Sequence, residues 1–468
     1  MAINYKEVVK EKGYRKLLMT TIINRFGDSI DAIAFTWLVY QVTHSGAWSA
    51  IIFGMNILPN VIVQPFAGAV VERLDKKKVM VVTHTLRGLV LIAFIAMYLS
   101  GLVNGWIMAG FTFIITSIES FNMPASTAFI PRIIRKEHLT YALSLNTSVS
   151  SMVTLVGTGV AGVIIAKAGV YTAMIIDVIT FFVSALIILS IRESEMVKQE
   201  NVGAETNNNS DTSISEIRND FDSNRSEAHT TQHPSYLATL KDGISYIKSQ
   251  RVILNYCLIA VVVNFLLVPI NALQAPLISE CYHMGSGMLS LMGMTCSIGS
   301  IIGSVMIPVI SSKLGMKKSM VYFGCLMGLG IILVPMGGMF EANVLKYIFC
   351  GLCCIIMVGS SAILSGMINV SLIANIEEKY LARAAGVFTA AVTGSMPVAS
   401  ALVSWAKLRL ETGMLIRVGG IATLAFFIIL VIVNPELEIK KGTENEDKTA
   451  GEYQEIQKGQ RAYAGENG

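Results

Sequence analysis

Long apolar blocks separated by short polar segments run along nearly the whole chain. Each block is close to the roughly 20 residues that an α-helix needs to cross the hydrocarbon core of a bilayer. Backbone groups inside a bilayer must be hydrogen-bonded within the segment, which favours helices over open strands. We predict twelve spans in two sets of six, at 17–40, 47–71, 79–100, 104–127, 143–166 and 170–191, then at 252–279, 286–311, 319–339, 343–373, 382–406 and 414–434. The pattern indicates an all-α integral membrane protein.

The composition supports this class and excludes others. Hydrophobic residues make up 53% of the 468 positions and charged residues only 15%, whereas soluble domains carry about a quarter charged residues. The net charge of +4 gives no reason to expect a nucleic-acid partner. No segment matches the phosphate-binding pattern G-x-x-x-x-G-K-[ST]. We therefore expect neither an enzyme nor a protein driven directly by ATP, and no cofactor.

The seven cysteines lie in or beside the apolar blocks of the second half. Cys350, Cys353 and Cys354 are spaced like a ligand cluster, but no His or carboxylate stands near them. Small thiols in an apolar helix are typical of buried packing positions. We predict no metal site there.

Two polar regions interrupt the pattern. The segment 193–235 is acidic and almost without bulky apolar residues, which predicts a disordered linker. After it, residues 235–251 place apolar side chains on one helical face, which predicts a surface helix lying along the membrane. We therefore predict an N-terminal six-helix bundle at 1–192, the linker at 193–235, the surface helix with a C-terminal six-helix bundle at 236–434, and a cytoplasmic tail at 435–468.

Basic residues predict the orientation. They gather in the loops after spans two, four, eight and ten, at Arg73, Lys76, Lys77, Lys78, Arg132, Arg135, Lys136, Lys313, Lys317, Lys318, Lys379 and Arg383. Loops rich in Lys and Arg stay in the cytoplasm. We therefore expect a multi-pass protein of the cell membrane with both termini in the cytoplasm. Lys407 and Arg409, in the loop after span eleven, run against this rule.

The two sets of spans are related in sequence. The segments 72–77 and 312–317 occupy the same place, after the second span of each set, 240 positions apart. Leu139 and Leu381 open the fifth and eleventh spans, 242 positions apart. Such a repeat is typical of a six-plus-six transporter, whose substrate site lies between the halves near the midplane.

The loop after span two resembles a family signature. Gly68, Glu72, Arg73, Asp75 and Lys77 fit the pattern G-x-x-x-D-R-x-G-R-K of the major facilitator superfamily, with Glu72 replacing Asp and Asp75 replacing Gly. A glycine there lets two helices approach closely.

The resemblance implies that Glu72 faces the start of helix eleven near Arg383 and latches one conformation. The basic residues would anchor the cytoplasmic surface. The other interpretation is an ordinary basic turn.

Later segments are similar to the macrolide-efflux and siderophore-exporter branch of that superfamily. The junction between helices four and five carries its pattern, at Pro124, Ala125, Ala128, Pro131, Glu137, Leu139, Ala142, Leu145 and Asn146. Gly157, Gly159 and Gly162 look like the helix-packing glycines of the antiporter motif in helix five. Helix four lacks the arginine that many drug–proton antiporters carry. The resemblance implies the major facilitator fold, with two pseudo-symmetric six-helix bundles.

The first span contains three charged residues, Arg25, Asp28 and Asp31. Their spacing places them within a sector of about 120° on one helix face. A charge at the bilayer centre costs about 2.5–3.5 kcal/mol, so such residues face a cavity or a partner. Arg25 and Asp28 can pair on consecutive turns, which leaves Asp31 as the carboxylate that exchanges protons. A static Arg25–Asp28 pair that only packs the helix is the alternative.

Further polar residues lie inside spans three, four and six. Glu119 needs a partner, and Arg87 is the nearest cation by depth. A structural pair and a proton relay both remain open for these two residues. Asp177 lies nearer the outer half of its span, and we expect it to tie helices together.

We predict a secondary active exporter of small amphipathic molecules, drug-like or macrolide-like, that works by substrate/proton antiport. Its partners are a small-molecule substrate, protons and the lipid bilayer, and we expect a monomer. One alternative is the export of a native metabolite such as a siderophore or a peptide. Another is a membrane sensor that binds its ligand without transporting it.

Overall fold

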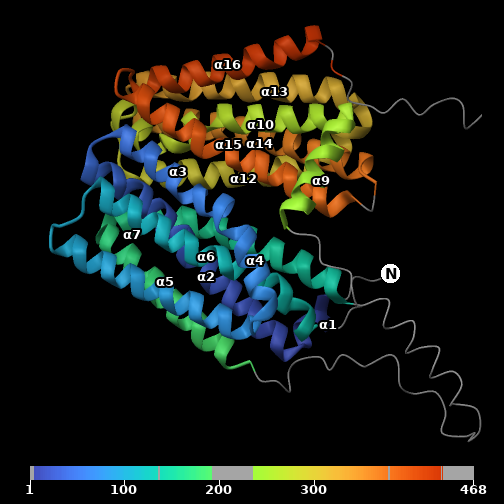
Figure 1. The fold of residues 1–468 in the computed structure, drawn as a ribbon. Coiled ribbons are helices and arrows are strands. Elements are labelled where there is room, and N and C mark those ends of the chain that lie inside the picture. The colour runs from blue at the N-terminus through green and yellow to red at the C-terminus, as the bar shows by residue number, and fades with distance from the viewer. Residues whose placement is uncertain (1–4, 135–137, 192–235, 378–379, 434, 436–468) are drawn as a thin grey trace, which may run out of the picture.

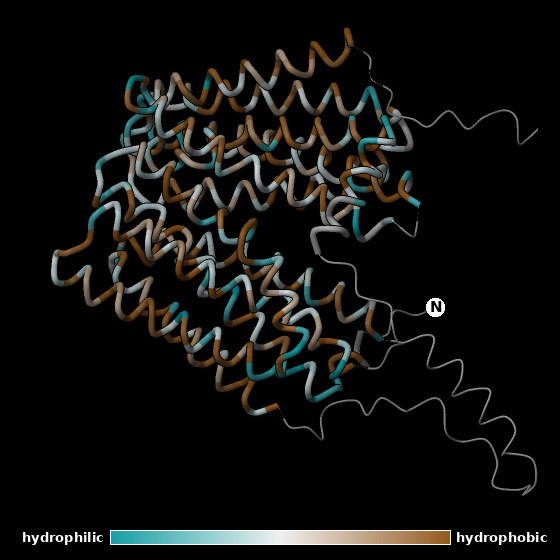
Figure 2. Tube along the Cα trace, viewed as in Figure 1, coloured by the Kyte–Doolittle hydropathy of each residue, from teal (hydrophilic) through white to brown (hydrophobic). Residues whose placement is uncertain are grey.

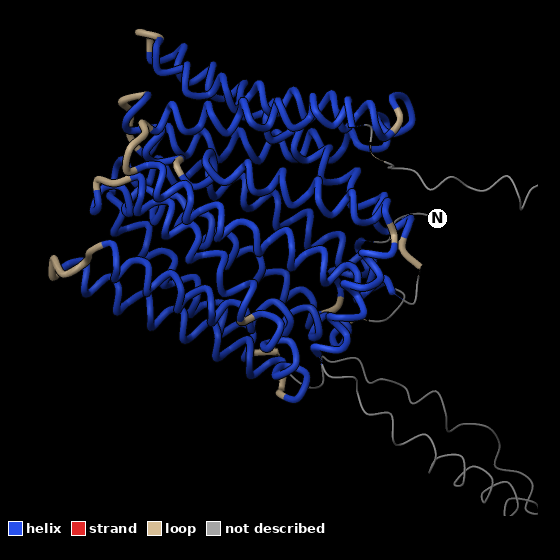
Figure 3. The backbone as a smooth tube through the Cα atoms, turned by 45° about the horizontal axis from the view of Figure 1, so that its top comes forward, coloured by secondary structure: helices blue, strands red, loops and turns tan. Residues whose placement is uncertain are grey.

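The computed structural model describes residues 5–134, 138–191, 236–377, 380–433 and 435. All regular elements within these ranges are helical (Figures 1 and 3). The linker predicted at 193–235 and all but the first residue of the predicted tail lie outside the described residues. The first bundle contains α1 (Tyr5–Lys10), α2 (Lys12–Thr43), α3 (Gly46–Ile62), α4 (Gln64–Arg73), α5 (Lys76–Leu99), α6 (Gly105–Ile133) and α7 (Leu139–Leu189).

The second bundle follows after the undescribed segment, as the colour gradient in Figure 1 shows. It contains α9 (Tyr236–Ser249), α10 (Arg251–Ala272), α11 (Gln274–Pro276), the π-helical turn η3 (Leu277–Cys281), α12 (Ser286–Leu314), α13 (Met316–Leu333), the 3₁₀ helix η4 (Val334–Met339), α14 (Asn343–Asn375), α15 (Leu381–Lys407) and α16 (Thr412–Val433). The predicted spans match these helices closely, and the ends differ by a few residues.

The long helix α7 folds back on itself at Gly169. This glycine has φ +82° and breaks the helical backbone. The Tyr14 hydroxyl donates to the carbonyl of Ala142 at 2.8 Å, and the Lys16 ammonium donates to the carbonyl of Ser190 at 2.8 Å. A straight helix of this length would separate its ends by about 75 Å. Because both ends of α7 bond to the same turn of α2, α7 comprises two antiparallel segments, as the predicted fifth and sixth spans require.

Eight described helices are long and apolar enough to cross a membrane, or nine if the bent pair α3–α4 counts as one span. The helices α2 and α6 carry the polar and charged residues discussed below and are not among them. If α3–α4 counts as one span and α7 as two, and if α2 and α6 are added, the total reaches the twelve predicted spans. That total stays a prediction. Hydrophobic residues follow the outer helices α5 and α16 in Figure 2, the face that lipid covers.

The repeat predicted from sequence appears in the helix boundaries. The helices α5 and α13 begin at Lys76 and Met316, 240 positions apart. The helices α7 and α15 begin at Leu139 and Leu381, 242 positions apart. The two halves therefore start equivalent helices at equivalent positions.

The two bundles pack against each other at the end opposite the termini. There α3 crosses α15, and the Ser400 hydroxyl donates to the carbonyl of Ala50. On the other side of the interface α7 crosses α12. Toward the end where the N-terminus lies, the bundles diverge (Figure 1). The contact is thus confined to one end of the molecule, which we call the closed end.

The predicted surface helix coincides with α9, which packs against the second bundle in this structure. Gly243 lies against the carbonyl of Arg383, which a Cβ would meet at 3.0 Å, and the Tyr246 ring stacks on Tyr380 with centroids 4.3 Å apart. Tyr246 and Ile247 are buried, whereas Ile244 is exposed. The helix therefore docks on the start of α15 through a face that contains Gly243, Tyr246 and Ile247.

Candidate functional site

Arg87 of α5 lies at the centre of a group of acidic residues. It is 6% exposed. Its Nη2 lies 3.0 Å from Asp28 Oδ1 on α2 and 3.7 Å from Glu119 Oε2 on α6. The guanidinium also covers the ring of Phe181 on α7, 4.2 Å from the ring centroid. One buried arginine thus joins four helical segments. The Arg87–Glu119 contact that the sequence predicts is one of its interactions.

The predicted Arg25–Asp28 pair is not formed in this structure. Asp28 accepts hydrogen bonds from Arg87 and from Asn24 Nδ2, the latter at 2.6 Å. Arg25 is exposed. The carboxylate of Asp28 is instead occupied by a buried guanidinium, that of Arg87.

Asp177 belongs to the same group, which the sequence did not indicate. It is 1% exposed and accepts a hydrogen bond from Thr180 Oγ1 at 3.1 Å. Its side chain packs over Gly27, where any Cβ would collide with Asp177 and Thr180. The absent side chain at Gly27 therefore brings Asp177 beside Asp28 instead of placing it nearer the outer end.

Asp31 completes the group. Its Oδ1 is enclosed and has no hydrogen-bond partner among the described residues. Asp31 interacts electrostatically with Asp28, Arg87 and Asp177. We call Asp28, Asp31, Glu119 and Asp177 together with Arg87 the acidic cluster.

The acidic cluster contains more negative than positive groups. Four carboxyl groups surround one guanidinium, and the adjacent His84 is buried with Nδ1 unpartnered among the described residues. An unpaired charge inside a membrane costs about 2.5–3.5 kcal/mol. The arrangement can therefore bind additional positive charge, as protons or as a cationic group. In the described ranges, no three His, Cys, Asp or Glu side chains, these carboxyl groups included, are placed so that they could hold a metal ion, and Cys350, Cys353 and Cys354 are free and buried there.

An apolar pocket adjoins the acidic cluster. It has a volume of about 380 Å³ and lies between α2 and α7. Ile22, Phe26, Met152 and Val156 contribute to its walls, together with Thr180. Because the Thr180 hydroxyl bonds to Asp177, the pocket and the cluster share a wall.

The signature loop does not form the predicted latch in this conformation. Glu72 is exposed, and Arg383 pairs with Asp242 of α9 at 3.5 Å. A Cβ at Gly68 would meet nothing within 4 Å, so the predicted close helix approach is absent. Both observations have the same cause, since this loop lies at the end where the bundles diverge.

The basic residues of the loop are used differently. Arg73 is exposed. The ammonium of Lys77 donates to the carbonyl of Ile191 at 2.6 Å, and that of Lys76 donates to the carbonyl of Glu72 at 2.6 Å. Lys77 thus joins the turn between α4 and α5 to the end of α7, and Lys76 closes the turn itself.

The glycines of the predicted motif all lie where helices pack closely, Gly157 within the first bundle and Gly159 and Gly162 at the interface between the halves. A Cβ at Gly157 would lie 2.8 Å from Ser29 of α2. At Gly159 it would lie 3.0 Å from the sulfur of Met294, and at Gly162 2.6 Å from Cβ of Ser290, both on α12. Gly159 and Gly162 therefore permit the α7–α12 crossing at the closed end.

A polar network at the closed end was missed by the sequence analysis. Glu280 of η3 lies 3.1 Å from the ammonium of Lys407 and accepts a hydrogen bond from the Thr412 hydroxyl at 2.6 Å. The hydroxyl of Tyr40, in the other bundle, donates to Glu280 at 3.2 Å. The ion pair explains why Lys407 violates the charge rule: its charge is neutralised locally. That violation was the signal that a counter-charge had to exist.

Two helical bundles with an internal repeat, an interface closed at one end and a buried acidic cluster define a membrane transporter. The chain belongs to the Major Facilitator Superfamily, whose family model matches residues 17–401. Macrolide efflux protein A of Streptococcus pyogenes is 20% identical over 391 residues, 83% of this chain and 86% of that protein. This likeness agrees with the branch that the sequence motifs resemble.

Other relatives match shorter stretches. The MFS-type transporter YkuC of Bacillus subtilis is 25% identical over 197 residues, 42% of this chain and 45% of that protein. The staphyloferrin A transporter of Staphylococcus aureus is 24% identical over 170 residues, 35% of this chain and 41% of that protein. The chain thus spans less than half the length of each of these two proteins.

Solved structures share the fold. A point mutant of the nucleoside transporter NupG superposes with a TM-score of 0.68 at 11% identity, covering 90% of this chain and 98% of that one. A bacterial homologue of the iron transporter ferroportin in its inward-facing state gives a TM-score of 0.64 at 14% identity, with the same coverage. At such identities the likeness shows the major facilitator fold alone.

Proposed function

We propose that this protein is a secondary active exporter of small amphipathic molecules that exchanges its substrate for protons. The observation that carries the proposal is the acidic cluster, in which four carboxyl groups share Arg87. Such an excess of acid inside a membrane protein binds and releases positive charge. Proton exchange at Asp31, whose enclosed oxygen lacks a partner among the described residues, is the step that would couple transport to the pH gradient.

We place both termini in the cytoplasm, because the basic loops lie at the end of the bundles that carries the termini. The closed end then faces outward, and the bundles diverge toward the cytoplasm (Figure 1). In this conformation the acidic cluster would lose protons to the cytoplasm. A substrate would enter from the same side and seat its apolar part in the pocket formed by Phe26 and Met152.

The reverse conformation completes the cycle. When the outer ends separate and the cytoplasmic ends approach, Glu72 would come near Arg383 and hold that state, as the family signature implies. Protons that enter from outside would then bind the acidic cluster and favour release of the substrate. This is alternating access around a fixed site between two repeats.

Relatives support the substrate class. Macrolide efflux protein A matches most of the chain. An apolar pocket beside an excess of carboxyl groups fits a molecule with an apolar body and a protonated amine. We therefore propose amphipathic amines, macrolide-like in size, as the substrates.

Everted membrane vesicles test the proposal. Uptake of a radiolabelled macrolide, or of a fluorescent lipophilic amine, should depend on this protein and should stop when the pH gradient is collapsed. If no amphipathic probe responds to the gradient, proton-coupled export is wrong. Vesicles without the protein provide the baseline.

Export of a native siderophore-like metabolite is the second candidate, and the likeness to the staphyloferrin A transporter favours it. The same vesicles distinguish the two. The probe is a siderophore of the carboxylate type, which is an anion, so its uptake would not compete with that of a lipophilic amine, whereas a second amine would compete.

A further inference from the structure

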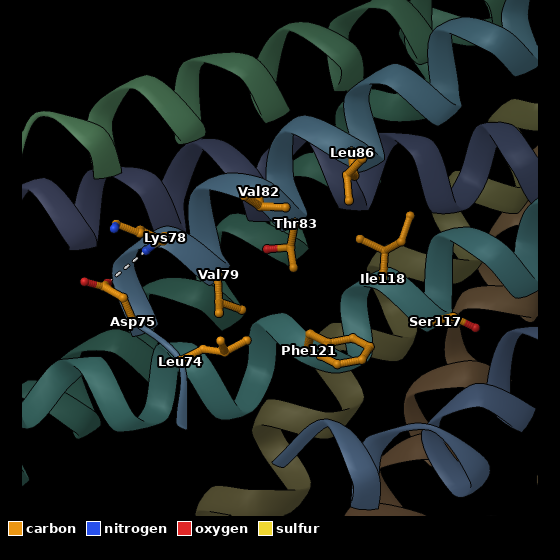
Figure 4. Close-up of a pocket in the computed structure, with 10 residues that line it drawn as sticks. All are labelled: Leu74, Asp75, Lys78, Val79, Val82, Thr83, Leu86, Ser117, Ile118 and Phe121. Carbon is orange, nitrogen blue, oxygen red and sulfur yellow. Dashed lines mark hydrogen bonds between the residues drawn. The ribbon is translucent and has the colours of Figure 1, made fainter. Parts of the chain in front are cut away.

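A groove on the side of the first bundle is separate from the acidic cluster. It lies between α5 and α6, near the turn that joins α4 to α5, and has a volume of about 440 Å³. Figure 4 shows Val79, Val82 and Leu86 of α5 on one side and Ile118 and Phe121 of α6 on the other. The side chains of Val82 and Leu86 are 53% and 42% exposed. The groove therefore opens on a surface that lipid covers.

The polar atoms in the walls are already used. The Thr83 hydroxyl donates to the carbonyl of Met80 at 2.9 Å, and the Ser117 hydroxyl donates to the carbonyl of Phe113 at 2.6 Å. The groove thus presents hydrocarbon to its contents. A hydrocarbon chain fits such walls, because it leaves no polar group unsatisfied.

The end of the groove nearest the termini carries a cation. Three lysines follow one another at the start of α5, and two of them, Lys76 and Lys77, donate to backbone carbonyls. Lys78 lines the groove and is exposed, and its ammonium has no hydrogen bond or ion pair with any described residue. The neighbouring carboxylate of Asp75 caps α5 by accepting the Lys78 backbone N–H at 3.1 Å, a position in which the helix dipole offsets part of its charge.

We propose that this groove binds one anionic phospholipid, with an acyl chain between α5 and α6 and the phosphate on the Lys78 ammonium. Basic residues attract anionic lipids at the membrane surface, and Arg73, Lys76 and Lys77 add to the positive field at this end. The lipid would lie against Leu74 and Asp75, the turn of the family signature. This lipid site requires that the first bundle lies in a membrane, and it is independent of which substrate the protein transports.

Native mass spectrometry of the full-length, delipidated protein in detergent tests the site. The protein is titrated with dioleoylphosphatidylglycerol, and the dissociation constant of the first bound lipid is measured. Lys78→Ala should weaken it about fivefold, the effect of one lysine near a membrane surface. The matched control is Lys318→Ala, which removes the same charge from the equivalent first turn of α13 and should change the constant less than twofold. Dioleoylphosphatidylcholine should bind to the wild type at least about fivefold more weakly.

A second variant tests the groove itself. Val82→Trp fills the groove from an exposed position, so the thermal midpoint should stay within the wild-type range while the first lipid is lost. The proposal is wrong if the two lysine variants behave alike, if the two lipids bind equally, or if Val82→Trp keeps the lipid. It is also wrong if a macrolide probe displaces the lipid from the wild type, since the groove would then belong to the substrate path.

Discussion

Glu280 Oε2 and Lys407 Nζ lie 3.1 Å apart at the closed end, joining η3 to the last turn of α15. The Lys407 side chain also covers Gly46 at the start of α3, where a Cβ would meet its Cε at 2.6 Å. Tyr40 of α2 donates to the same Glu280 carboxylate. One ion pair in the second bundle therefore contacts two helices of the first bundle, and it stabilises the arrangement in which this end is closed.

Replacing Glu280 by Gln should destabilise the closed end. Lys407 would keep its charge without a partner, and leaving a partly buried charged group unsatisfied costs about 1–3 kcal/mol. Hydrogen–deuterium exchange should rise in the backbone of residues 277–286 and 405–412 and fall around residues 68–75, as the population shifts toward a state in which this end is open and the opposite end is closed.

Tyr40→Phe is the graded control for that experiment. It removes the hydrogen bond that Tyr40 donates to Glu280 and leaves the ion pair in place; such a bond is worth about 1 kcal/mol, so exchange should change in the same direction by a smaller amount. Equal exchange in the wild type and in Glu280→Gln would mean that the ion pair does not hold the closed end.

Gly162→Ala should impair the protein, and Gly68→Ala should not. At Gly162 the added methyl group lies within 2.6 Å of Ser290 and 3.1 Å of the Gly287 backbone. Overpacking of this kind costs about 1–3 kcal/mol. At Gly68 the methyl group meets open space, and the helix propensity of Ala over Gly adds up to about 1 kcal/mol of stability.

The measurement for both glycine variants is the thermal midpoint in detergent, followed by the vesicle assay. The pair is matched, because each is a glycine in a helix of the first bundle. A stable Gly162→Ala protein with full transport would show that α7 and α12 move apart without cost.

Arg87→Met should make folding depend on pH. The variant leaves Asp28 and Glu119 without their guanidinium, and breaking a buried ion pair costs about 3 kcal/mol or more. The folded bundle must then take up protons that the unfolded chain does not hold at neutral pH, so the folded state binds more protons. Stability therefore falls as pH rises, and thermal midpoints between pH 5 and 8 measure the slope.

The double variant Arg87→Met/Asp28→Leu separates charge from packing. It removes both members of the pair, so most of the lost stability should return and the slope with pH should become shallower. A single variant whose midpoint does not change with pH would show that Arg87 is not the counter-charge of the acidic cluster.

Asp31→Asn should abolish proton coupling while the protein stays folded. The amide has nearly the same shape but binds no proton, and the enclosed oxygen of Asp31 makes no hydrogen bond within the described chain that the change would break. Uptake in everted vesicles should fall to the level seen without a pH gradient, with an unchanged thermal midpoint. Asp31→Glu keeps a titrating group and should retain part of the response; full coupling in Asp31→Asn would remove Asp31 from the mechanism.

Several features could be predicted from the sequence because they depend on neighbouring residues. The apolar blocks located the helices, and Leu139 and Leu381 open α7 and α15 as the repeat required. The contact between Arg87 and Glu119 followed from matching their depths in two adjacent spans. The Lys407 anomaly was visible too, although its partner was not.

Other features depend on the distances between helices. The spacing of residues along one helix gives no information about those distances. Spacing on α2 suggested Arg25 as the partner of Asp28, whereas the fold supplies Arg87, 59 positions away. Gly27 determines where Asp177 lies. Because Gly27 has no Cβ, the segment of α7 that carries Asp177 and Thr180 can approach α2 closely.

The sequence by itself thus determined the class, the helices and the repeat, since hydrophobic length and helix ends are local properties of the chain. Only the tertiary structure decided which carboxylates gather around Arg87, which end is closed, and that Glu280 meets Lys407 across 127 positions. The physical reason is that a buried charge pairs with whichever partner packing brings near it, and packing is a property of all the helices together.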